Sequence, residues 1–227
     1  MDHKEMAARE AVKYIEDGMI VGLGSGSTAS IAIKLIGEKV KGEGIDIIGI
    51  PTSKASDLLG RAVGIKIGEL DDHPHVDITI DGADEVGPKL NLVKGLGGAL
   101  LREKIVAAAT QLELIVVDDS KLVQFIGQKS PLPVEIAKFS YKTTMLRLAS
   151  LGCSPVLRMI EDAPYVTDNG NYIADCRFQK IADPAAMEIK IDHIPGVVES
   201  GLFIGLTSRV IVGSPSGIRI LEKQCML

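Results

Sequence analysis

The sequence predicts an α/β fold, in which a mostly parallel sheet carries helices on both faces, plus an inserted, smaller α+β domain. Short apolar segments alternate with segments of helical periodicity up to about residue 121, which is the pattern of a parallel sheet. From about residue 131 to 204 the chain mixes strand and helix patterns without that alternation. Two further apolar segments, 209–212 and 218–221, could return to the first sheet.

The first region predicts strands from its apolar segments and helices from apolar side chains spaced three and four residues apart. The expected strands are 19–23, 46–51, 65–67, 76–80, 90–93 and 112–117. The expected helices are 6–18, 29–40, 53–63 and 99–111.

The second region predicts a small α+β domain. We expect a linker at residues 131–133 and a hairpin around the turn Thr167-Asp168-Asn169-Gly170. Asp183 followed by Pro184 is typical of a helix start. The expected strands are 134–136, 155–160, 171–178 and 196–203, and the expected helices are 141–151 and 184–192.

Composition narrows the class of protein. The chain has 227 residues and a net charge of −5, which argues against a nucleic-acid partner but leaves room for a local phosphate pocket. Cys153, Cys176 and Cys225 are widely separated, which suggests neither a disulfide framework nor a zinc site and fits a reducing compartment. No apolar stretch reaches the roughly 20 residues of a membrane helix, and the charged N-terminus lacks a signal-type apolar core. We therefore expect a cytoplasmic protein with no membrane partner.

The loop that carries His73 and His75 offers imidazoles and carboxylates, which would suit a metal. Its proline and its polar composition favour a solvated surface loop instead. No metal or cofactor is expected.

Four polar loops follow expected strands. Gly24-Ser25-Gly26-Ser27-Thr28 joins a strand to a helix N-terminus, where backbone N–H groups and the helix dipole favour a phosphate. Asp81 to Asp84, Lys94 to Gly97 and Lys121 follow three other strands. Because ligands of parallel sheets bind at the carboxyl ends of the strands, we expect the four loops to converge on one cleft. The first loop taken alone also fits a turn made for packing.

The charged groups of these loops suit proton transfer on a small phosphorylated sugar. An aldose–ketose isomerisation needs a base that moves a proton between neighbouring carbons, and positive charge beside the enediolate oxygen. A carboxylate fills the first role, and Lys94 among its glycines fills the second. On spacing alone, Asp81 and Asp84 also fit turn stabilisation. Glu103 likewise fits a solvated helix face, and Lys121 a surface loop.

Seven segments in order give the chain a specific resemblance. They are GLGSGST (22–28), DGADE (81–85), KGLGGALLREK (94–104), DDSK (118–121), PLPVE (131–135), TDNGN (167–171) and IPGVVESGLF (194–203). Together they resemble the type A ribose-5-phosphate isomerases over essentially the whole chain. The resemblance implies interconversion of D-ribose 5-phosphate and D-ribulose 5-phosphate through an enediolate, in the non-oxidative pentose phosphate pathway, without metal or organic cofactor. It also implies a homodimer or homotetramer.

The resemblance assigns roles by motif. Glu103 would be the base, and Asp81 would assist opening of the furanose ring. Lys94 with Asp84 would stabilise the enediolate. The implied substrate-binding residues are Ser25, Gly26, Ser27, Thr28, Asp81, Gly82, Ala83, Asp84, Lys94, Gly95, Leu96, Gly97 and Lys121. Ser25 stands where the family commonly has threonine, so a hydroxyl is kept.

We expect a Rossmann-like catalytic domain formed by residues 1–130 with 205–227. Residues 131–204 are expected to form a ferredoxin-like α+β domain that mediates oligomerisation.

Two other functions fit parts of the sequence. A non-catalytic sugar-phosphate sensor would use a related fold, but no basic helix-turn-helix pattern accompanies it. A nucleotide-binding oxidoreductase would need Gly-x-Gly-x-x-Gly, and in Gly22-x-Gly24-x-Gly26 the third glycine comes one residue early. The isomerase is therefore the predicted function, and the sensor is its alternative.

Overall fold

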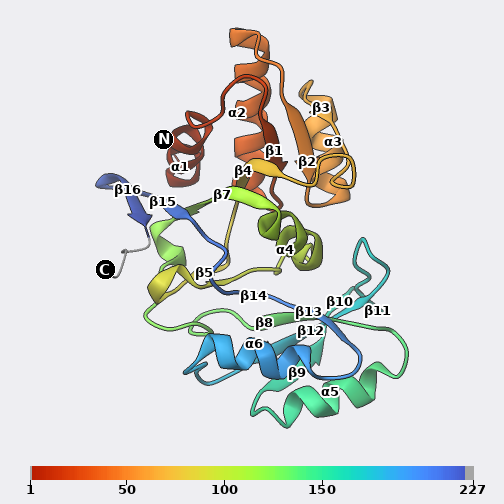
Figure 1. Cartoon of the computed structure of the whole chain (residues 1–227). Coiled ribbons are helices and arrows are strands. Elements are labelled where there is room, and N and C mark those ends of the chain that lie inside the picture. The colour runs from red at the N-terminus through yellow and green to blue at the C-terminus, as the bar shows by residue number, and fades with distance from the viewer. Residues whose placement is uncertain (1, 223–227) are drawn as a thin grey trace. The chain divides into compact units, whose positions relative to one another are not determined.

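The computed structural model describes residues 2–222, which form two compact units (Figure 1). Unit 1 comprises the residues up to Ala83, Arg102–Lys121 and the residues from Gly205 onward. Unit 2 comprises Asp84–Leu101 and Leu122–Ile204. The predicted domains share the boundary after residue 204 but place 84–101 and 122–130 in the larger domain, and those domain limits stay a prediction. Within residues 2–222, no helix is long and apolar enough to span a membrane.

Unit 1 is built on one seven-stranded sheet. Its strands are β1 (Ile20–Leu23), β2 (Ile48–Pro51), β3 (Lys66–Ile67), β4 (Val76–Asp81), β7 (Thr110–Asp118), β15 (Arg209–Ser214) and β16 (Gly217–Glu222). They lie in the order β16-β15-β7-β4-β1-β2-β3, and every neighbouring pair is parallel except β15 and β16. The predicted parallel sheet is confirmed, and the two C-terminal strands return to it.

Helices cover both faces of this sheet, as predicted. They are α1 (His3–Val12), α2 (Ser27–Glu43), α3 (Lys54–Ala62) and α4 (Leu100–Ala108). Two neighbouring residues of β1 show that both faces of the sheet are covered, because successive side chains of a strand point to opposite faces. Val21 packs in the cluster that contains Ala8 of α1 and Ile33 of α2, whereas Ile20 packs in the cluster of Val106 from α4.

The first helix differs from its predicted range of 6–18. It begins at His3, where the side chain of Asp2 caps the N–H of Lys4, and it ends at Val12. Residues beyond Val12 continue as turns, and the N–H of Gly18 donates to the carbonyl of Asp46. The prediction was too long because the apolar spacing continues beyond the end of the helix as far as Met19. Ile15 lies outside the helix but packs in the same core.

Unit 2 contains a four-stranded antiparallel sheet with two helices. Its elements are β8 (Leu132–Ile136), α5 (Tyr141–Ala149), β9 (Ser154–Leu157), β12 (Tyr172–Arg177), α6 (Pro184–Asp192) and β13 (Val197–Ser200). The strand order β13-β8-β12-β9 is that of a β-α-β-β-α-β ferredoxin-like domain. Leu148 of α5 and Ile191 of α6 pack in its core. The predicted small α+β fold is confirmed.

Unit 2 also holds a small sheet and a hairpin. The sheet consists of β5 (Glu85–Val86), β6 (Leu92–Val93) and β14 (Leu202–Phe203), in the order β14-β6-β5. The hairpin consists of β10 (Met159–Ile160) and β11 (Ala163–Pro164). Unit 2 also contains the 3-10 helix η1 (Pro88–Leu90), whereas the 3-10 helix η2 (Asp119–Lys121) belongs to unit 1.

Three local predictions in unit 2 were wrong. Residues 131–133 are no linker, because β8 begins at Leu132 and lies between β13 and β12. The predicted strands 155–160 and 196–203 each divide in two, at Arg158 and at Gly201, where the chain leaves one sheet for another element. The turn at 167–170 does not join a simple hairpin, since β12 pairs with β9 and β8. Its Thr167 hydroxyl donates instead to buried Glu135 at 3.0 Å.

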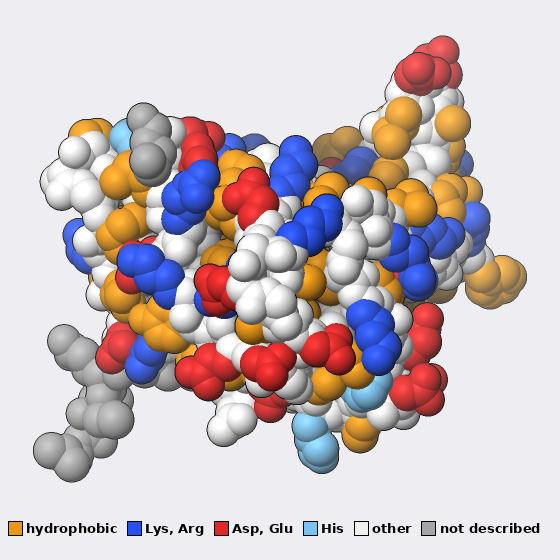
Figure 2. Space-filling model, turned by 90° about the horizontal axis from the view of Figure 1, so that it is seen from above, with side chains coloured by type: hydrophobic (Ala, Val, Ile, Leu, Met, Phe, Trp, Pro, Cys, Tyr) orange, Lys and Arg blue, Asp and Glu red, His pale blue; other side chains and the backbone are white. Residues whose placement is uncertain are grey.

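Cys153 and Cys176 are free and buried in unit 2, whereas Cys225 lies outside the described residues. On the face viewed in Figure 2, lysine and arginine side chains are interspersed with aspartate and glutamate. This mixed pattern differs from the basic stripe that nucleic-acid binding predicts.

Candidate active site

Asp81 ends β4 in unit 1 and holds the loop that follows β1. The residue is 1% exposed, and its Oδ1 accepts hydrogen bonds from the N–H groups of Ser25 at 2.9 Å and Gly82 at 2.7 Å. Gly24 permits this approach, because a Cβ atom there would lie 2.3 Å from the same oxygen. Hydrogen bonds to an ionised acceptor are roughly twice as strong as neutral ones. Asp81 therefore stabilises the turn, which is one of the two roles that the sequence left open.

The Ser25 hydroxyl belongs to a network of hydroxyl groups. Its Oγ lies 2.8 Å from Thr52 Oγ1 and donates to Ser53 Oγ at 2.7 Å. Ser53 caps α3 in a reciprocal capping box with Ser56. The network ties the loop after β1 to the start of α3, so the hydroxyl at position 25 has a structural function.

The N-terminus of α2 has the features of an anion site. Gly26 precedes the helix with a φ of 93°, and no side chain caps it. Backbone N–H groups in the first turn of a helix lack intrahelical partners, and the helix dipole favours negative charge there. Ser27 and Thr28 begin this turn, and Lys4 Nζ donates to Ser27 Oγ at 3.3 Å. A positive charge thus stands beside the helix N-terminus.

Lys121 and Lys4 both act on Asp118, which ends β7. The N–H of Ser120 donates to Asp118 Oδ1 at 2.9 Å, and the Ser120 hydroxyl donates to the same atom. Burial opposes the ionisation of Asp118, but these hydrogen bonds and the charges of Lys4 and Lys121 outweigh burial and lower its pKa. Two lysines therefore lie near the carboxyl end of β7.

Lys4 was missed by the sequence reasoning. It lies on α1, outside every motif, and its contact is with a residue 23 positions away. One signal was available: Lys4, Ala8 and Ala11 share a helical face, and both alanines are fully buried. A lysine on the stripe that faces the sheet is unusual enough to mark a polar site.

Glu103 lies in the first turn of α4 and is 5% exposed. Two residues later, Ile105 is 50% exposed. The interpretation of Glu103 as part of a solvated helix face is therefore wrong. A buried carboxylate is costly unless a function or a partner requires it, which strengthens Glu103 as the candidate base.

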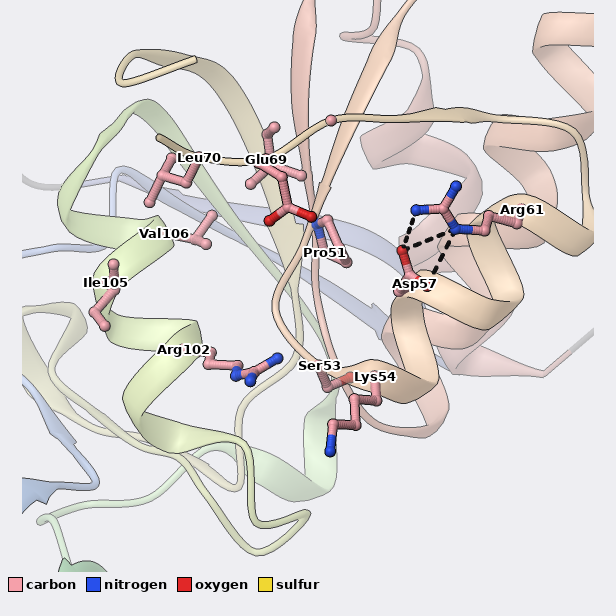
Figure 3. A pocket seen from close by; sticks show the side chains of 12 residues that line it. Pro51, Ser53, Lys54, Asp57, Arg61, Glu69, Leu70, Arg102, Ile105 and Val106 are labelled. Atoms are coloured by element: carbon pink, nitrogen blue, oxygen red, sulfur yellow. Dashed lines mark hydrogen bonds and ion pairs between the residues drawn. The ribbon is translucent and has the colours of Figure 1, made fainter. Parts of the chain in front are cut away.

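A cavity of about 400 Å³ in unit 1 lies between α3 and α4, at the carboxyl end of β2 (Figure 3). Its charged lining mixes both signs, and Asp57 pairs with Arg61 at 3.0 Å. Arg102, which directly precedes Glu103, and Ser53, which bonds Ser25, also line it. The lining residues are Ile50, Pro51, Ser53, Lys54, Asp57, Arg61, Gly68, Glu69, Leu70, Arg102, Ile105 and Val106. The cavity therefore adjoins α4, which carries the candidate base Glu103, and the start of α3, to which the Ser25 loop is bonded.

Asp84 and Lys94 lie in unit 2. The N–H of Asp84 donates to the carbonyl of Val93 at 2.8 Å, and its Oδ2 accepts from the N–H of Leu96 at 2.9 Å. Lys94 is 2% exposed, with Nζ 5.4 Å from the centre of the Phe203 ring. The structure therefore brings Asp84 together with the loop from Lys94 to Gly97.

The expectation that all four loops follow strands of one parallel sheet was wrong for Lys94. The strand before it, β6, pairs antiparallel with β5 and β14 in unit 2. The segment is too short to show, from its own pattern, which sheet it joins. Ser25–Thr28, Asp81 and Lys121 do follow β1, β4 and β7 of the parallel sheet.

Glu85, the last residue of DGADE, has a structural role. It is fully buried, and its carboxylate accepts the N–H groups of Gly127 at 2.7 Å and of Lys129 and Ser130 at 2.6 Å each. These three bonds attach the segment that precedes β8 to β5, next to Asp84 in the sequence. Among the described residues, no three His, Cys, Asp or Glu side chains gather as metal ligands.

Comparison with known proteins decides the family. The profile of ribose 5-phosphate isomerase A (phosphoriboisomerase A) matches residues 48–217. The chain belongs to this family. The ribose-5-phosphate isomerase A of Gloeobacter violaceus is 52% identical over 96% of this chain and 95% of its own length. The enzyme of Pyrococcus abyssi is 44% identical over 97% of both chains.

Solved structures of the family agree over nearly the whole chain. Ribose 5-phosphate isomerase A from Methanocaldococcus jannaschii superposes with a TM-score of 0.94 at 41% identity, covering 98% of this chain and 99% of its own. A D-ribose-5-phosphate isomerase in complex with phospho-erythronic acid gives 0.95 at 43% identity, covering 98% and 100%. The predicted family, the α/β fold and the isomerase class are confirmed.

Proposed function

We propose that this chain interconverts D-ribose 5-phosphate and D-ribulose 5-phosphate through an enediolate. The observation that carries the proposal is the full-length similarity to ribose-5-phosphate isomerases, one of them solved with phospho-erythronic acid. That compound is a sugar acid phosphate, whose planar carboxylate resembles an enediolate. We expect it to bind this chain as well. The similarity favours the enzyme over the non-catalytic sensor.

The phosphate is assigned to the N-terminus of α2 with Lys4 and Lys121. Support comes from the uncapped first turn of α2, the contact of Lys4 with Ser27, and the effect of both lysines on Asp118. A dianion gains from two positive charges and from the helix dipole. Binding energy from this remote group holds the reacting carbons in place.

Glu103 is assigned as the base. In the forward direction its carboxylate takes the proton from C2 of the open-chain aldose. The C–H electrons form the C1=C2 bond, and the carbonyl electrons move to O1. Glu103 then returns the proton to C1, while the proton of O2 passes to O1 and C2 becomes the ketone. The burial of Glu103 supports this role, because exclusion of water keeps the proton from exchanging with solvent.

Lys94 and Asp84 are assigned to the oxygens of the enediolate. Support comes from the buried ammonium of Lys94 and from the glycine loop that Asp84 holds. A positioned base contributes about 10²–10⁴-fold and one oxyanion donor about 10²–10³-fold. Neither suffices alone, so both are needed together with the fixed phosphate. Asp81 assists ring opening and keeps the phosphate loop in place.

The remaining predicted binding positions are assigned to substrate contacts through their backbone or hydroxyl groups. They are Gly26, Thr28, Gly82, Ala83, Gly95, Leu96 and Gly97.

Glu103→Gln tests the proposal. The amide keeps the shape of the side chain but cannot accept the proton, so we expect turnover to fall about 10²–10⁴-fold, as removal of a base predicts. Binding of phospho-erythronic acid, measured by calorimetry, should stay within a few-fold of the parent. The assay follows ketopentose formation with a chelator present. Near-normal turnover of the variant would remove Glu103 from the mechanism, and an inactive parent chain would end the proposal. Glu16→Gln, at an exposed glutamate, is the control.

We also propose a homodimer or homotetramer with contacts through unit 2, in a cytoplasmic location. Exposed apolar side chains of unit 2 support the assembly: Phe139 is 90% exposed, and Met159 and Ile160 of β10 are 48% and 58% exposed. Burial of such side chains between copies would remove apolar surface from water. Light scattering coupled to size exclusion measures the mass, and a monomer at micromolar concentration would contradict the assembly.

A further inference from the structure

The loop from Lys94 to Gly98 has an unusual backbone. Gly95 and Gly98 have φ values of +103° and +83°, in the region that glycine tolerates. The N–H of Gly98 donates to the carbonyl of Gly95 at 3.0 Å. Leu96 and Gly97, between them, are exposed. A short exposed loop of this kind needs outside contacts to hold one conformation.

Arg158 supplies such contacts from between β9 and β10. Its Nη1 donates to the carbonyls of Gly95 and Leu96, both at 3.0 Å. Its Nε and Nη2 donate to Asp175 of β12 at 2.9 and 2.5 Å. The Arg158 side chain is 13% exposed and that of Asp175 is 21% exposed. The ion pair is thus shielded, and it fixes the guanidinium plane while leaving one edge for the loop.

The backbone of Arg158 is anchored as well. Its N–H donates to the carbonyl of Ile173 at 2.8 Å, and its carbonyl accepts from the N–H of Tyr165 at 2.9 Å. The Tyr165 ring lies 5.8 Å from the Arg158 guanidinium carbon. The same ring packs on Gly98, where a Cβ atom would be 2.1 Å from the tyrosine oxygen. Arg158 and Tyr165 therefore support the loop at both of its ends.

The contacts of Arg158 determine the direction of two peptide groups. In a trans peptide, the C=O of one residue and the N–H of the next point in opposite directions. The carbonyls of Gly95 and Leu96 both face Arg158. The N–H groups of Leu96 and Gly97 must therefore point away from it. The first of these donates to Asp84 Oδ2 at 2.9 Å, so the N–H of Gly97 is directed to the side on which Asp84 lies.

We propose that Arg158 is a positioning residue: its guanidinium, held by Asp175, orients the Lys94–Gly98 loop so that the Gly97 N–H is presented to a substrate oxygen and Asp84 is kept in place. The inference rests on the proposed function of residues 94–97 as part of the substrate site. Lysine cannot replace Arg158, because a single ammonium group lacks the planar fork that contacts a carboxylate and two carbonyls together.

Kinetics of Arg158→Ala and Arg158→Lys test the role. We expect kcat to fall about 10- to 100-fold in both variants, the size of effect that one misplaced oxyanion donor produces. KM should change less than about threefold, because the role inferred for Arg158 involves no direct contact with the substrate and leaves the phosphate loop intact. Methylguanidine at millimolar concentration should restore part of the kcat of Arg158→Ala. The matched control is Arg177→Ala, at an exposed arginine on the strand of Asp175.

Amide hydrogen exchange measures how well the Lys94–Gly98 loop is held, independently of enzyme turnover. We expect the N–H of Leu96 to exchange at least about tenfold faster in Arg158→Lys than in the parent, because the Asp84 contact is loosened. The inference is overturned if kcat of both variants stays within twofold of Arg177→Ala, or if Leu96 exchange is unchanged. If Arg158→Ala does not fold, Arg158→Lys and Asp175→Asn decide by the same criteria. If the unsubstituted protein has no isomerase activity, the proposed function is refuted. The exchange rate of the Leu96 N–H would still test whether Arg158 holds the loop.

Discussion

Gly24→Ala probes the contact on which the loop after β1 depends. A Cβ atom at position 24 would lie 2.3 Å from Oδ1, 2.5 Å from Cγ and 2.6 Å from Cα of Asp81. Rotation of the Asp81 side chain cannot relieve the contact with its Cα atom. The N–H of Gly24 also donates to the carbonyl of Ile80 at 3.1 Å, so the loop cannot move without loss of this bond. The alanine must therefore push β1 and β4 apart at their carboxyl ends.

The expected loss of stability can be worked out from the hydrogen bond that such a shift breaks and from the overpacking that the added methyl group causes. A hydrogen bond to a charged group is worth about 1.5–3 kcal/mol, and an extra methyl group in a packed interior costs about 1–3 kcal/mol. Loss of one bond to Asp81 together with the overpacking should lower the free energy of unfolding by about 2.5–6 kcal/mol. Because the loop leads into α2, KM for ribose 5-phosphate should rise by about tenfold or more.

Urea unfolding followed by circular dichroism measures the first effect, and steady-state kinetics the second. Gly42→Ala is the matched control, because Gly42 lies in α2 and a Cβ atom added there would have nothing within 4 Å. It should leave KM unchanged and raise stability by up to about 1 kcal/mol, as replacement of a helical glycine does. A Gly24→Ala protein with the stability and KM of the parent would refute the reasoning about Asp81.

Three further predictions test single contacts. Lys4→Met should raise KM about tenfold with little change in kcat, because Lys4 is assigned to the phosphate; steady-state kinetics against Lys13→Met, at an exposed lysine, checks it, and a loss confined to kcat would contradict it. Glu85→Gln should lower the free energy of unfolding by about 1–3 kcal/mol, since the amide group cannot accept all three backbone N–H groups; urea unfolding that matches the parent would count against this role. Asp118 has a lowered pKa in the folded protein, so its contribution is present above its ordinary pKa and is lost as pH falls through the folded value. Asp118→Asn should therefore cost about 0.5–1.5 kcal/mol at neutral pH and nothing in strong acid, and an equal deficit at every pH would argue for a purely steric effect.

Much of the fold was predicted from local patterns, because short-range signals within each segment determine most helices and strands of unit 1. The strand of Ile20–Leu23, the glycine loop and α2 follow one another as expected, since an apolar segment, a glycine turn and a 3.6-residue period each act at short range. The start of α6 was also predicted: Asp183 caps it, accepting from the N–H of Ala186 at 3.1 Å, and Pro184 opens it.

Predictions failed where pairing between distant segments decided the structure. Leu132 and Pro133 looked like a linker, yet they begin the central strand β8, opposite Cys176 and Asp175 of β12. Proline lacks an N–H, but the carbonyl of Pro133 still accepts from Gly201 at 2.8 Å. The local sequence does not indicate which distant strand will pair with residues 132–133. Their proline-rich composition therefore favoured the linker interpretation, which was wrong.

The motifs alone identified the family and supplied the candidate residues, because residue types at fixed spacings carry the chemistry: a carboxylate at 103, a lysine among glycines at 94 and hydroxyls before a helix. Only the tertiary structure decided how these groups are held. It placed the Ser25 hydroxyl against Thr52, and Lys4 against Ser27. Arg158 contacts the carbonyl of Gly95, 63 positions away. Side-chain partners are selected by strand order and packing, and these depend on the whole chain, whereas a sequence motif records only its immediate neighbours.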